Sequence, residues 1–152
     1  MTRQRYDQGD TEFGNWLRTN LYINARLGYA AHNLDYIWYA FRKNWIMLIE
    51  EKRHDAKQTF SQTETHGIIH QILENGCRLP VKTISGEKII DYRGYFLIQF
   101  QNTNPDDSEW IKINDEIYTK WDLLYLLRNG ILKHGTEEQE IIDEYKRQTN
   151  SG

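Results

Sequence analysis

The sequence predicts an α/β fold: a mixed central β-sheet flanked by helices, with an appended β-hairpin and C-terminal helix. Three observations predict it. Residues 33–39 (NLDYIWY) and 45–52 (WIMLIEEK) are rich in the β-branched and aromatic residues that strands favour. Residues 63–75 carry apolar positions at helical spacing. Residues 95–100 (YFLIQF) form the clearest buried strand of the second half and should extend the sheet.

The chain is expected to begin with a flexible arm and a helix. Residues 1–10 (MTRQRYDQGD) are polar, and Thr11 is a suitable N-cap for a helix through about Asn20. Three apolar residues of that helix fall at i, i+3 and i+4 and form one stripe: Phe13, Trp16 and Leu17. Residues 21–32 are compatible with a loop or with a further strand.

The two β-prone segments are predicted to form a hairpin. Residues 40–44 are a short polar connection of the length that joins antiparallel strands, so Asp35 should return towards Glu50. Because side chains alternate along a strand, Glu50 and Lys52 should share one face, and Glu51 should project from the other.

After the hairpin, residues 61–64 (SQTE) match a capping box for the flanking helix. That helix should end near Gly76 and bury four apolar residues: Ile68, Ile69, Ile72 and Leu73. His66 and His70 are four apart on one face. Because no third ligand stands at a recognisable spacing, phosphate or water contacts, or plain surface positions, are preferred over a zinc site.

The remaining elements are shorter. Residues 77–92 should contain a hairpin around Gly86, and residues 110–118 a second one turning at Asn114-Asp115. Thr119 should cap a helix that Gly130 ends, with buried Trp121, Leu123, Leu124, Leu126 and Leu127. Residues 136–152 form an acidic tail with a short helix, and the whole of 1–152 is expected to be a single domain.

Composition points to a globular intracellular protein. With 39% hydrophobic and 13% aromatic residues, the chain is too apolar for a disordered protein. The single Cys77 cannot form an intramolecular disulfide, and neither a signal peptide nor a membrane span is recognisable. A cytoplasmic setting is expected, the host cytoplasm if the source is viral. No nucleotide-cofactor signature is present.

Charge gives mixed support for nucleic-acid binding. The formal net charge is −3, whereas nucleic-acid binders are generally basic over the binding face. Residues 1–57, however, carry nine Lys and Arg against seven Asp and Glu, and residues 58–130 carry seven against ten. The basic part therefore contains the hairpin.

The hairpin carries the candidate site. A carboxylate pair, Asp35 and Glu50, at the end of an apolar strand is costly to desolvate unless a cation compensates it, and hard oxygen ligands suit Mg²⁺ or Mn²⁺. Lys52 could orient a water or stabilise charge on a phosphate. Spacing alone leaves open a half-buried strand whose last charges are leaving the core. Two other acid-x-Lys triplets, at residues 55–57 and 144–146, lack the strand context.

With these residues the chain resembles the PD-(D/E)XK nuclease superfamily, closest in layout to Holliday-junction-resolvase-like members. The resemblance covers roughly residues 10–101 and implies a restriction-endonuclease-like core. Asp35, Glu50 and Lys52 match the superfamily motif, and Glu12 matches the extra helical Glu of many members. Two features depart from it: Leu34, not Pro, precedes Asp35, and no Gln-x-x-x-Tyr follows the motif.

The resemblance implies a Mg²⁺-dependent endonuclease that hydrolyses DNA, with Mn²⁺ as a substitute and a homodimer to cut both strands. Asp35, Glu50 and Lys52 would be catalytic. The metal ligands would be Glu12, Asp35, Glu50 and the backbone carbonyl of Ile49 or Glu51. Candidate DNA contacts are Arg42, Lys43, Arg53, Lys57, Gln62 and His66. The alternatives are a catalytically silent nucleic-acid-binding or assembly protein on the same fold, and an unrelated small interaction domain.

Overall fold

The computed structural model describes residues 12–30, 32–54 and 56–150. The chain forms two compact units, residues 1–33 and 34–152. The predicted arm, residues 1–10, and the predicted N-cap Thr11 lie outside the described residues.

The described residues of the first unit form one α-helix and one 3₁₀ turn. Helix α1 spans Glu12–Thr19, and on its apolar stripe the rings of Phe13 and Trp16 stack with centroids 5.9 Å apart. The 3₁₀ helix η1 spans Ala25–Leu27, and Gly28 closes it in the left-handed region at φ 94°. Residues 21–30 thus form turns and η1 rather than a strand, in agreement with the loop alternative.

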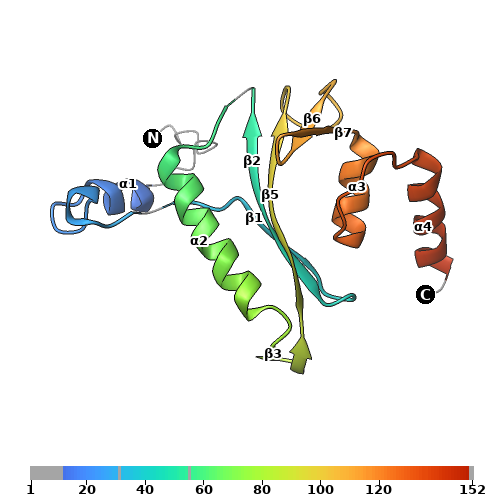
Figure 1. The fold of residues 1–152 in the computed structure, drawn as a ribbon, viewed down its shortest axis with the longest axis horizontal. Coiled ribbons are helices and arrows are strands. Elements are labelled where there is room, and N and C mark those ends of the chain that lie inside the picture. The colour runs from blue at the N-terminus through green and yellow to red at the C-terminus, as the bar shows by residue number, and fades with distance from the viewer. Residues whose placement is uncertain (1–11, 31, 55, 151–152) are drawn as a thin grey trace. The chain divides into compact units, whose positions relative to one another are not determined.

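The second unit is built on a five-stranded sheet, ordered β1-β2-β5-β6-β7. Its strands are β1 (Tyr36–Ala40), β2 (Trp45–Arg53), β5 (Asp91–Phe100), β6 (Ile111–Ile113) and β7 (Glu116–Tyr118). β2 and β5 are parallel and the other neighbours are antiparallel, so the predicted mixed sheet and the hairpin at its start are confirmed. Helix α2 (Phe60–Gly76) joins the two parallel strands (Figure 1).

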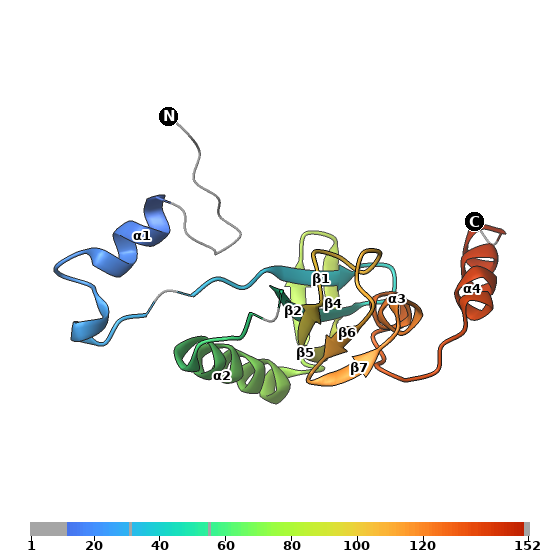
Figure 2. The ribbon, with the colours of Figure 1, turned by 90° about the horizontal axis from the view of Figure 1, so that it is seen from above.

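The two faces of the sheet differ in character. One face carries Trp45, Met47 and Ile49 of β2, which form the buried core with alternate residues of β5 and with Leu123 and Leu126 of α3 (Lys120–Asn129). The opposite face is the one that α2 covers, and Figures 1 and 2 show α2 and α3 on opposite sides of the sheet. The alternate side chains of β2, Ile46, Leu48, Glu50 and Lys52, therefore project from the face that α2 covers.

A bulge in β5 changes which side chains meet α2. Ile46 of β2 lies opposite Tyr92, but Leu48 lies opposite Tyr95, so β5 advances one residue further than β2. Gly94 takes the extra position at φ 123°, a conformation that glycine adopts far more easily than other residues. Because of the bulge, Tyr92 and Tyr95 both face α2, although they are three residues apart.

The structure corrects two expectations for α2. The capping box is formed by Thr59 and Gln62, not by residues 61–64, and the helix begins at Phe60. The apolar residues Ile68, Ile69, Ile72 and Leu73 are exposed, and His66 is the buried residue of the helix. The physical reason is that α2 meets the sheet where Tyr92 and Tyr95 present hydroxyl groups, so its histidine face, which can bond them, turns inward.

Both predicted hairpins are present, but the one within residues 110–118 extends the five-stranded sheet through the pairing of β6 with β5 and is not an appended element. β3 (Pro80–Thr83) and β4 (Gly86–Ile89) form a separate two-stranded sheet. β6 and β7 turn at Asn114 and Asp115, which have φ of 51° and 71°. Both values lie in the left-handed region that such tight turns require.

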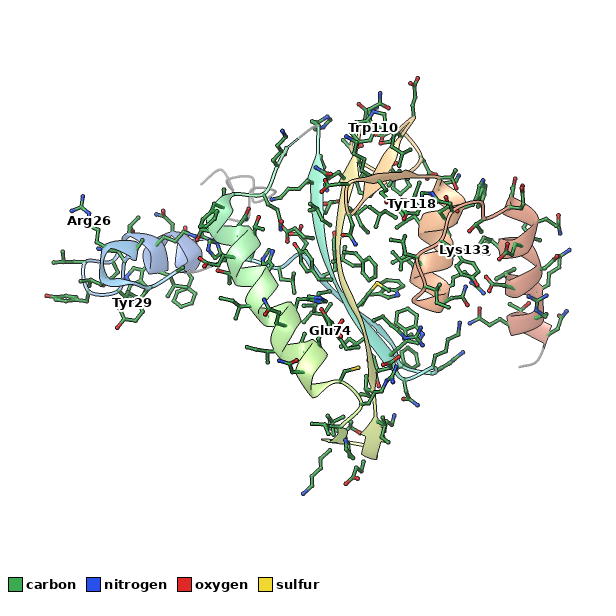
Figure 3. All side chains as sticks on the ribbon, viewed as in Figure 1. Arg26, Tyr29, Glu74, Trp110, Tyr118 and Lys133 are labelled. Atoms are coloured by element: carbon green, nitrogen blue, oxygen red, sulfur yellow. The ribbon has the colours of Figure 1, made fainter. Side chains whose placement is uncertain are left out.

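The C-terminal helices pack on one another. α3 is capped by Thr119 and ends at Gly130, both as predicted. The acidic tail forms α4 (Glu138–Asn150), longer than the expected short helix. Lys133, labelled in Figure 3, donates to Glu140 of α4 at 2.7 Å and lies 4.1 Å from the ring centroid of Tyr125 in α3. None of the described helices has the length and apolar character needed to span a membrane.

Candidate active site

The β1–β2 hairpin brings Asp35 next to Glu50. Tyr36 pairs with Ile49, so Asp35, one residue before β1, stands at the position opposite Glu50. The Oδ2 atom of Asp35 accepts a hydrogen bond of 2.8 Å from the Glu51 N–H. The Asp35 carboxylate therefore accepts a bond from β2 just beyond the last pair of the β1–β2 ladder, and this bond holds it against β2.

Glu50 is a buried carboxylate with an incomplete set of partners. Its residue is only 3% exposed, and its Oε1 atom lies 3.3 Å from the Lys52 ammonium on the same strand face. Its Oε2 atom is buried and has no hydrogen-bond partner within the described part of the chain. A buried carboxylate oxygen left without a partner is costly, and native proteins keep such atoms rarely.

The electrostatics of Glu50 reflect this placement. Burial raises the pKa of Glu50 above its ordinary value, and the nearby Asp35 carboxylate raises it further, while Lys52 and His66 act in the opposite direction. Two carboxylates share the site and one of them is desolvated. A cation between them would relieve both effects.

A polar cluster that sequence patterns did not reveal lies on the same side of the sheet. The His66 Nδ1 atom lies 3.0 Å from the Tyr95 hydroxyl and 3.0 Å from the Gln58 amide nitrogen, and Gln58 also donates to Tyr95. Burial raises the pKa of Tyr95 well above its usual range. One helical turn further along α2, the His70 Nδ1 atom lies 2.8 Å from the Tyr92 hydroxyl, and burial raises the pKa of Tyr92 to about 12.

The sequence carried little signal for this cluster. Gln58 stands in a polar stretch, and Tyr95 begins what reads as a purely structural strand. Only the strand register and the bulge at Gly94 show that Tyr95 and Glu50 share a side. The i, i+4 spacing of His66 and His70 was visible, but their burial was not.

The other predicted site residues are dispersed. Arg42 and Lys43 lie at the hairpin tip, at the opposite end of β1 and β2 from Asp35. Arg53 pairs with Glu51 at 3.1 Å, and Lys57 is exposed. Gln62 is engaged in the cap of α2. His66 is buried, so it lies inside the unit rather than on a surface that DNA would meet. Glu12 is the first residue of α1 in the first unit.

The residues present fit a hard divalent cation bound with few protein ligands. Within residues 12–30, 32–54 and 56–150, no three His, Cys, Asp or Glu side chains form a metal-binding group. Mg²⁺, however, is commonly held by one or two carboxylates together with water and substrate phosphate. Asp35 and the unpartnered Oε2 atom of Glu50 supply such a pair.

The strand geometry also favours one of the two candidate carbonyls. The N–H and C=O of a strand residue face the same neighbour in an antiparallel ladder. Because the Glu51 N–H points to Asp35, its C=O faces the same edge, beyond the point where β1 begins. Ile49 instead lies opposite Tyr36 within the ladder. The Glu51 carbonyl is thus the better placed of the two.

Comparisons of the chain with protein-family models, curated proteins and solved structures give no match. The functional argument therefore rests on the geometry of the site.

Proposed function

We propose that the protein is a Mg²⁺-dependent deoxyribonuclease of the PD-(D/E)XK type. The observation that carries the proposal is Glu50: a buried carboxylate with one unpartnered oxygen, paired through the other to Lys52, and placed beside a second carboxylate, Asp35. A strand whose charges were merely leaving the core would expose Glu50 to water. The structure buries it instead.

In this proposal, Asp35, Glu50 and the Glu51 carbonyl hold the cation. A divalent cation bound there supplies a water of lowered pKa and positive charge beside the scissile phosphate. Asp35 is fixed for its role by the Glu51 N–H. Lys52 donates towards Glu50 and retains two further ammonium protons with which to position the attacking water or a phosphate oxygen.

The polar cluster supports the site from the α2 side. His66, Tyr95 and Gln58 bond one another, so each is fixed in orientation. His66 acts to lower the pKa of Glu50, and the Glu50 carboxylate contributes to the raised pKa of Tyr95. Their role in the proposal is to hold the buried wall of the site and to exclude bulk water from it.

The test of activity is plasmid nicking in Mg²⁺ and in chelator. Lys52→Ala should stop nicking, because the group that positions the nucleophile is lost, while circular dichroism shows an unchanged fold. Lys146→Ala is the matched control: it removes the lysine of another acid-x-Lys triplet, on α4, and should nick at the wild-type rate. Undiminished nicking by Lys52→Ala, or none by the wild-type protein, would contradict the proposal.

Metal binding is tested separately by calorimetric titration with Mn²⁺. The wild-type protein should bind, and Asp35→Ala and Glu50→Ala should not. Binding without nicking of any substrate would favour the catalytically silent alternative, and absence of both would favour an interaction domain. Linear, supercoiled, single-stranded and four-way-junction DNA, offered in parallel, would show which structure is cut.

A homodimer is part of the proposal, because two sites are needed to cut both strands in one encounter. Light scattering should then give twice the chain mass of 18.3 kDa. A mass of 18.3 kDa at the concentration that cleaves both strands would contradict it.

A further inference from the structure

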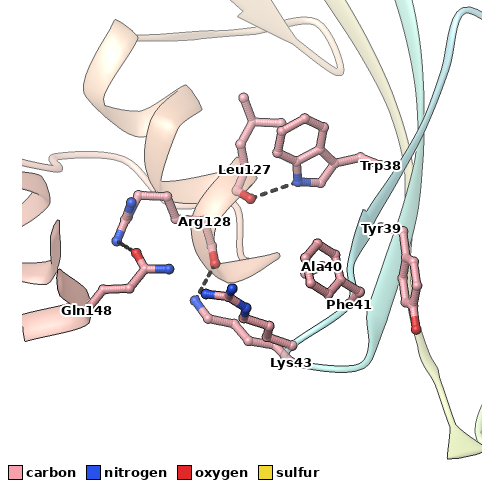
Figure 4. A pocket seen from close by; sticks show the side chains of 9 residues that line it. Trp38, Tyr39, Ala40, Phe41, Lys43, Leu127, Arg128 and Gln148 are labelled. Carbon is pink, nitrogen blue, oxygen red and sulfur yellow. Dashed lines mark hydrogen bonds between the residues drawn. The ribbon is translucent and has the colours of Figure 1, made fainter. Parts of the chain in front are cut away.

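A cavity of about 260 Å³ lies at the tip of the β1–β2 hairpin, away from Asp35 and Glu50 (Figure 4). It is bounded by the end of β1 and the turn that follows, by the C-terminal end of α3, and by α4. The lining residues that matter for its chemistry are Trp38, Phe41, Arg42, Lys43 and Arg128.

The cavity is electropositive although the chain is acidic. Its lining contains three cationic side chains and no Asp or Glu, whereas the whole chain has a formal net charge of −3. Lys43 donates to the Arg128 carbonyl oxygen at 2.6 Å, which fixes the ammonium but leaves two of its protons for another acceptor. Arg128 is bound to Gln148 at 2.7 Å and lies 3.5 Å from Glu144, so its charge is partly offset.

Arg42 and Lys43 form no ion pair with a carboxylate in the described part of the chain. The Arg42 guanidinium instead lies 5.7 Å from the ring centroid of Phe41. Guanidinium groups stack on flat rings and bind phosphate oxygens, so a ligand with both a ring and an anionic group is compatible with this pair.

The aromatic side chains at the cavity are substantially exposed to solvent. Phe41 is 63% exposed in a turn, where a polar residue would be less costly. Trp38 is 42% exposed, and its indole N–H donates to the Leu127 carbonyl oxygen at 2.8 Å, as Figure 4 shows. The bond fixes the Trp38 ring in one orientation beside the cavity.

We propose that this cavity binds a nucleotide unit of an unpaired nucleic-acid strand. The base stacks on Phe41 and Trp38, and the phosphate is held by Arg42 and Lys43; stacking platforms combined with cations are the usual means of binding single strands. The inference rests on the proposed function for its substrate class, but it concerns a second site that performs no cleavage.

The distance to the proposed cleavage site suits a strand bound at both. The chain is extended from Asp35 to Ala40 at the end of β1, and at about 3.3 Å per residue these five steps cover roughly 16 Å. That length corresponds to about five stacked nucleotides at about 3.4 Å each. Trp38 lies on the α3 face and Glu50 on the α2 face, so the strand would pass around β1, which is an edge strand of the sheet.

The test is fluorescence anisotropy of a labelled twelve-nucleotide oligothymidylate, titrated with the full chain in chelator so that no cleavage occurs. Phe41→Ala and Arg42→Ala should each weaken binding about tenfold, because each removes a stacking or charge contact. The matched controls are Phe60→Ala and Lys82→Ala, which remove an exposed aromatic ring and an exposed cation elsewhere and should stay within twofold of wild type.

A second arm uses an abasic oligomer of the same length. The wild-type protein should bind it about tenfold more weakly, and this difference should be smaller for Phe41→Ala, which retains only Trp38 for stacking. Equal wild-type affinity for the two oligomers would overturn the stacking role. Affinities of Phe41→Ala and Arg42→Ala within twofold of the wild-type affinity would overturn the proposed site. Absence of oligomer binding by the wild-type protein would also overturn it, and would favour a protein partner for the exposed aromatic residues.

The two proposals fail separately. Oligomer binding that depends on Phe41 and Arg42, without nicking of DNA, would contradict the nuclease proposal and support the nucleotide-binding cavity. Nicking that depends on Lys52, with oligomer binding unaffected by Phe41→Ala and Arg42→Ala, would contradict only the proposal for the cavity.

Discussion

At the scale of single residues, Glu50 and Lys52 form an ion pair with a high desolvation cost. The Glu50 carboxylate is buried and one of its oxygens is unpartnered, while Lys52 supplies a single compensating charge. Buried ion pairs are weak contributors to stability, because the cost of desolvation offsets the attraction between the charges. Burial of this pair is therefore weak evidence for a stabilising role.

This leads to a stability prediction. The double variant Glu50→Gln with Lys52→Met keeps the shapes of both side chains but removes both charges. Its free energy of unfolding, measured by urea titration in chelator, should equal that of wild type or exceed it by about 1–4 kcal/mol. Glu50→Gln alone is the control and should be less stable than the double variant, because it leaves Lys52 without its partner. A double variant clearly less stable than wild type would show that the pair serves the fold.

At the scale of elements, the α3 N-terminus and the β5 bulge show how local structure is tied into the unit. Asp122 is buried in the first turn of α3, where its two oxygens accept the N–H groups of Thr119 at 3.0 Å and Thr136 at 2.8 Å. The carboxylate thus joins the start of α3 to the segment leading into α4. In β5, the bulge at Gly94 plays the corresponding part by turning Tyr95 towards His66.

The Asp122 cap should make stability depend on pH. Burial alone would raise the pKa of Asp122, but the hydrogen bonds from Thr119 and Thr136 lower it below the ordinary value of 3.8. A lowered pKa stabilises the folded state above pH 3.8, and this contribution is lost as the pH falls through the folded-state value. Asp122→Ala should cost about 2 kcal/mol at pH 7, because a cap is lost and buried donors are left unpaired.

The measurement is the midpoint of urea unfolding at several pH values. The difference between wild type and Asp122→Ala should shrink as the pH falls below the ordinary value. Asp143→Ala, which removes an exposed acid from α4, serves as the control and should change stability little at any pH. A difference that stays constant down to acid pH would contradict the assignment of Asp122 as an ionised cap.

At the scale of the whole molecule, the hydrophobic core cluster found among the described residues lies in the second unit. Every member of the core cluster lies between Trp45 and Leu126, and the partly buried residues packed against it, Ala40, Leu127 and Leu132, also belong to residues 34–152. None of the described residues of the first unit, 12–30 and 32–33, is part of that cluster. The second unit therefore holds the interactions that a cooperative fold requires.

A fragment of residues 34–152 should accordingly fold by itself. We expect a single cooperative thermal transition by circular dichroism and a red shift of tryptophan emission on unfolding, because Trp45 is enclosed by the core of the folded fragment. A fragment of residues 34–109 lacks β6, β7 and α3, which supply a large share of that core, and should show no transition. A gradual, non-cooperative melt of the longer fragment would show that the first unit is needed for folding.

The sequence by itself determined the turns and helix ends that depend on interactions between residues close together in the chain. The 40–44 connection, the turn at Asn114-Asp115 and the α3 limits set by Thr119 and Gly130 follow from turn and capping chemistry, and the structure confirms them. Strand alternation placed Glu50 and Lys52 on one face, and the ion pair between them agrees. The nuclease function inferred from that spacing remains a proposal.

Only the tertiary structure decided what depends on contacts between distant segments. The parallel pairing of β2 with β5 and the bulge at Gly94 bring Tyr95 to the side of Glu50, and they turn the histidine face of α2 inward in place of its isoleucines. The hairpin tip and the end of α3 enclose a cationic cavity remote from the carboxylates. Periodicity describes which side chains of one element share a face, but the face that becomes buried is chosen by the partner it meets, and that partner is distant in the sequence.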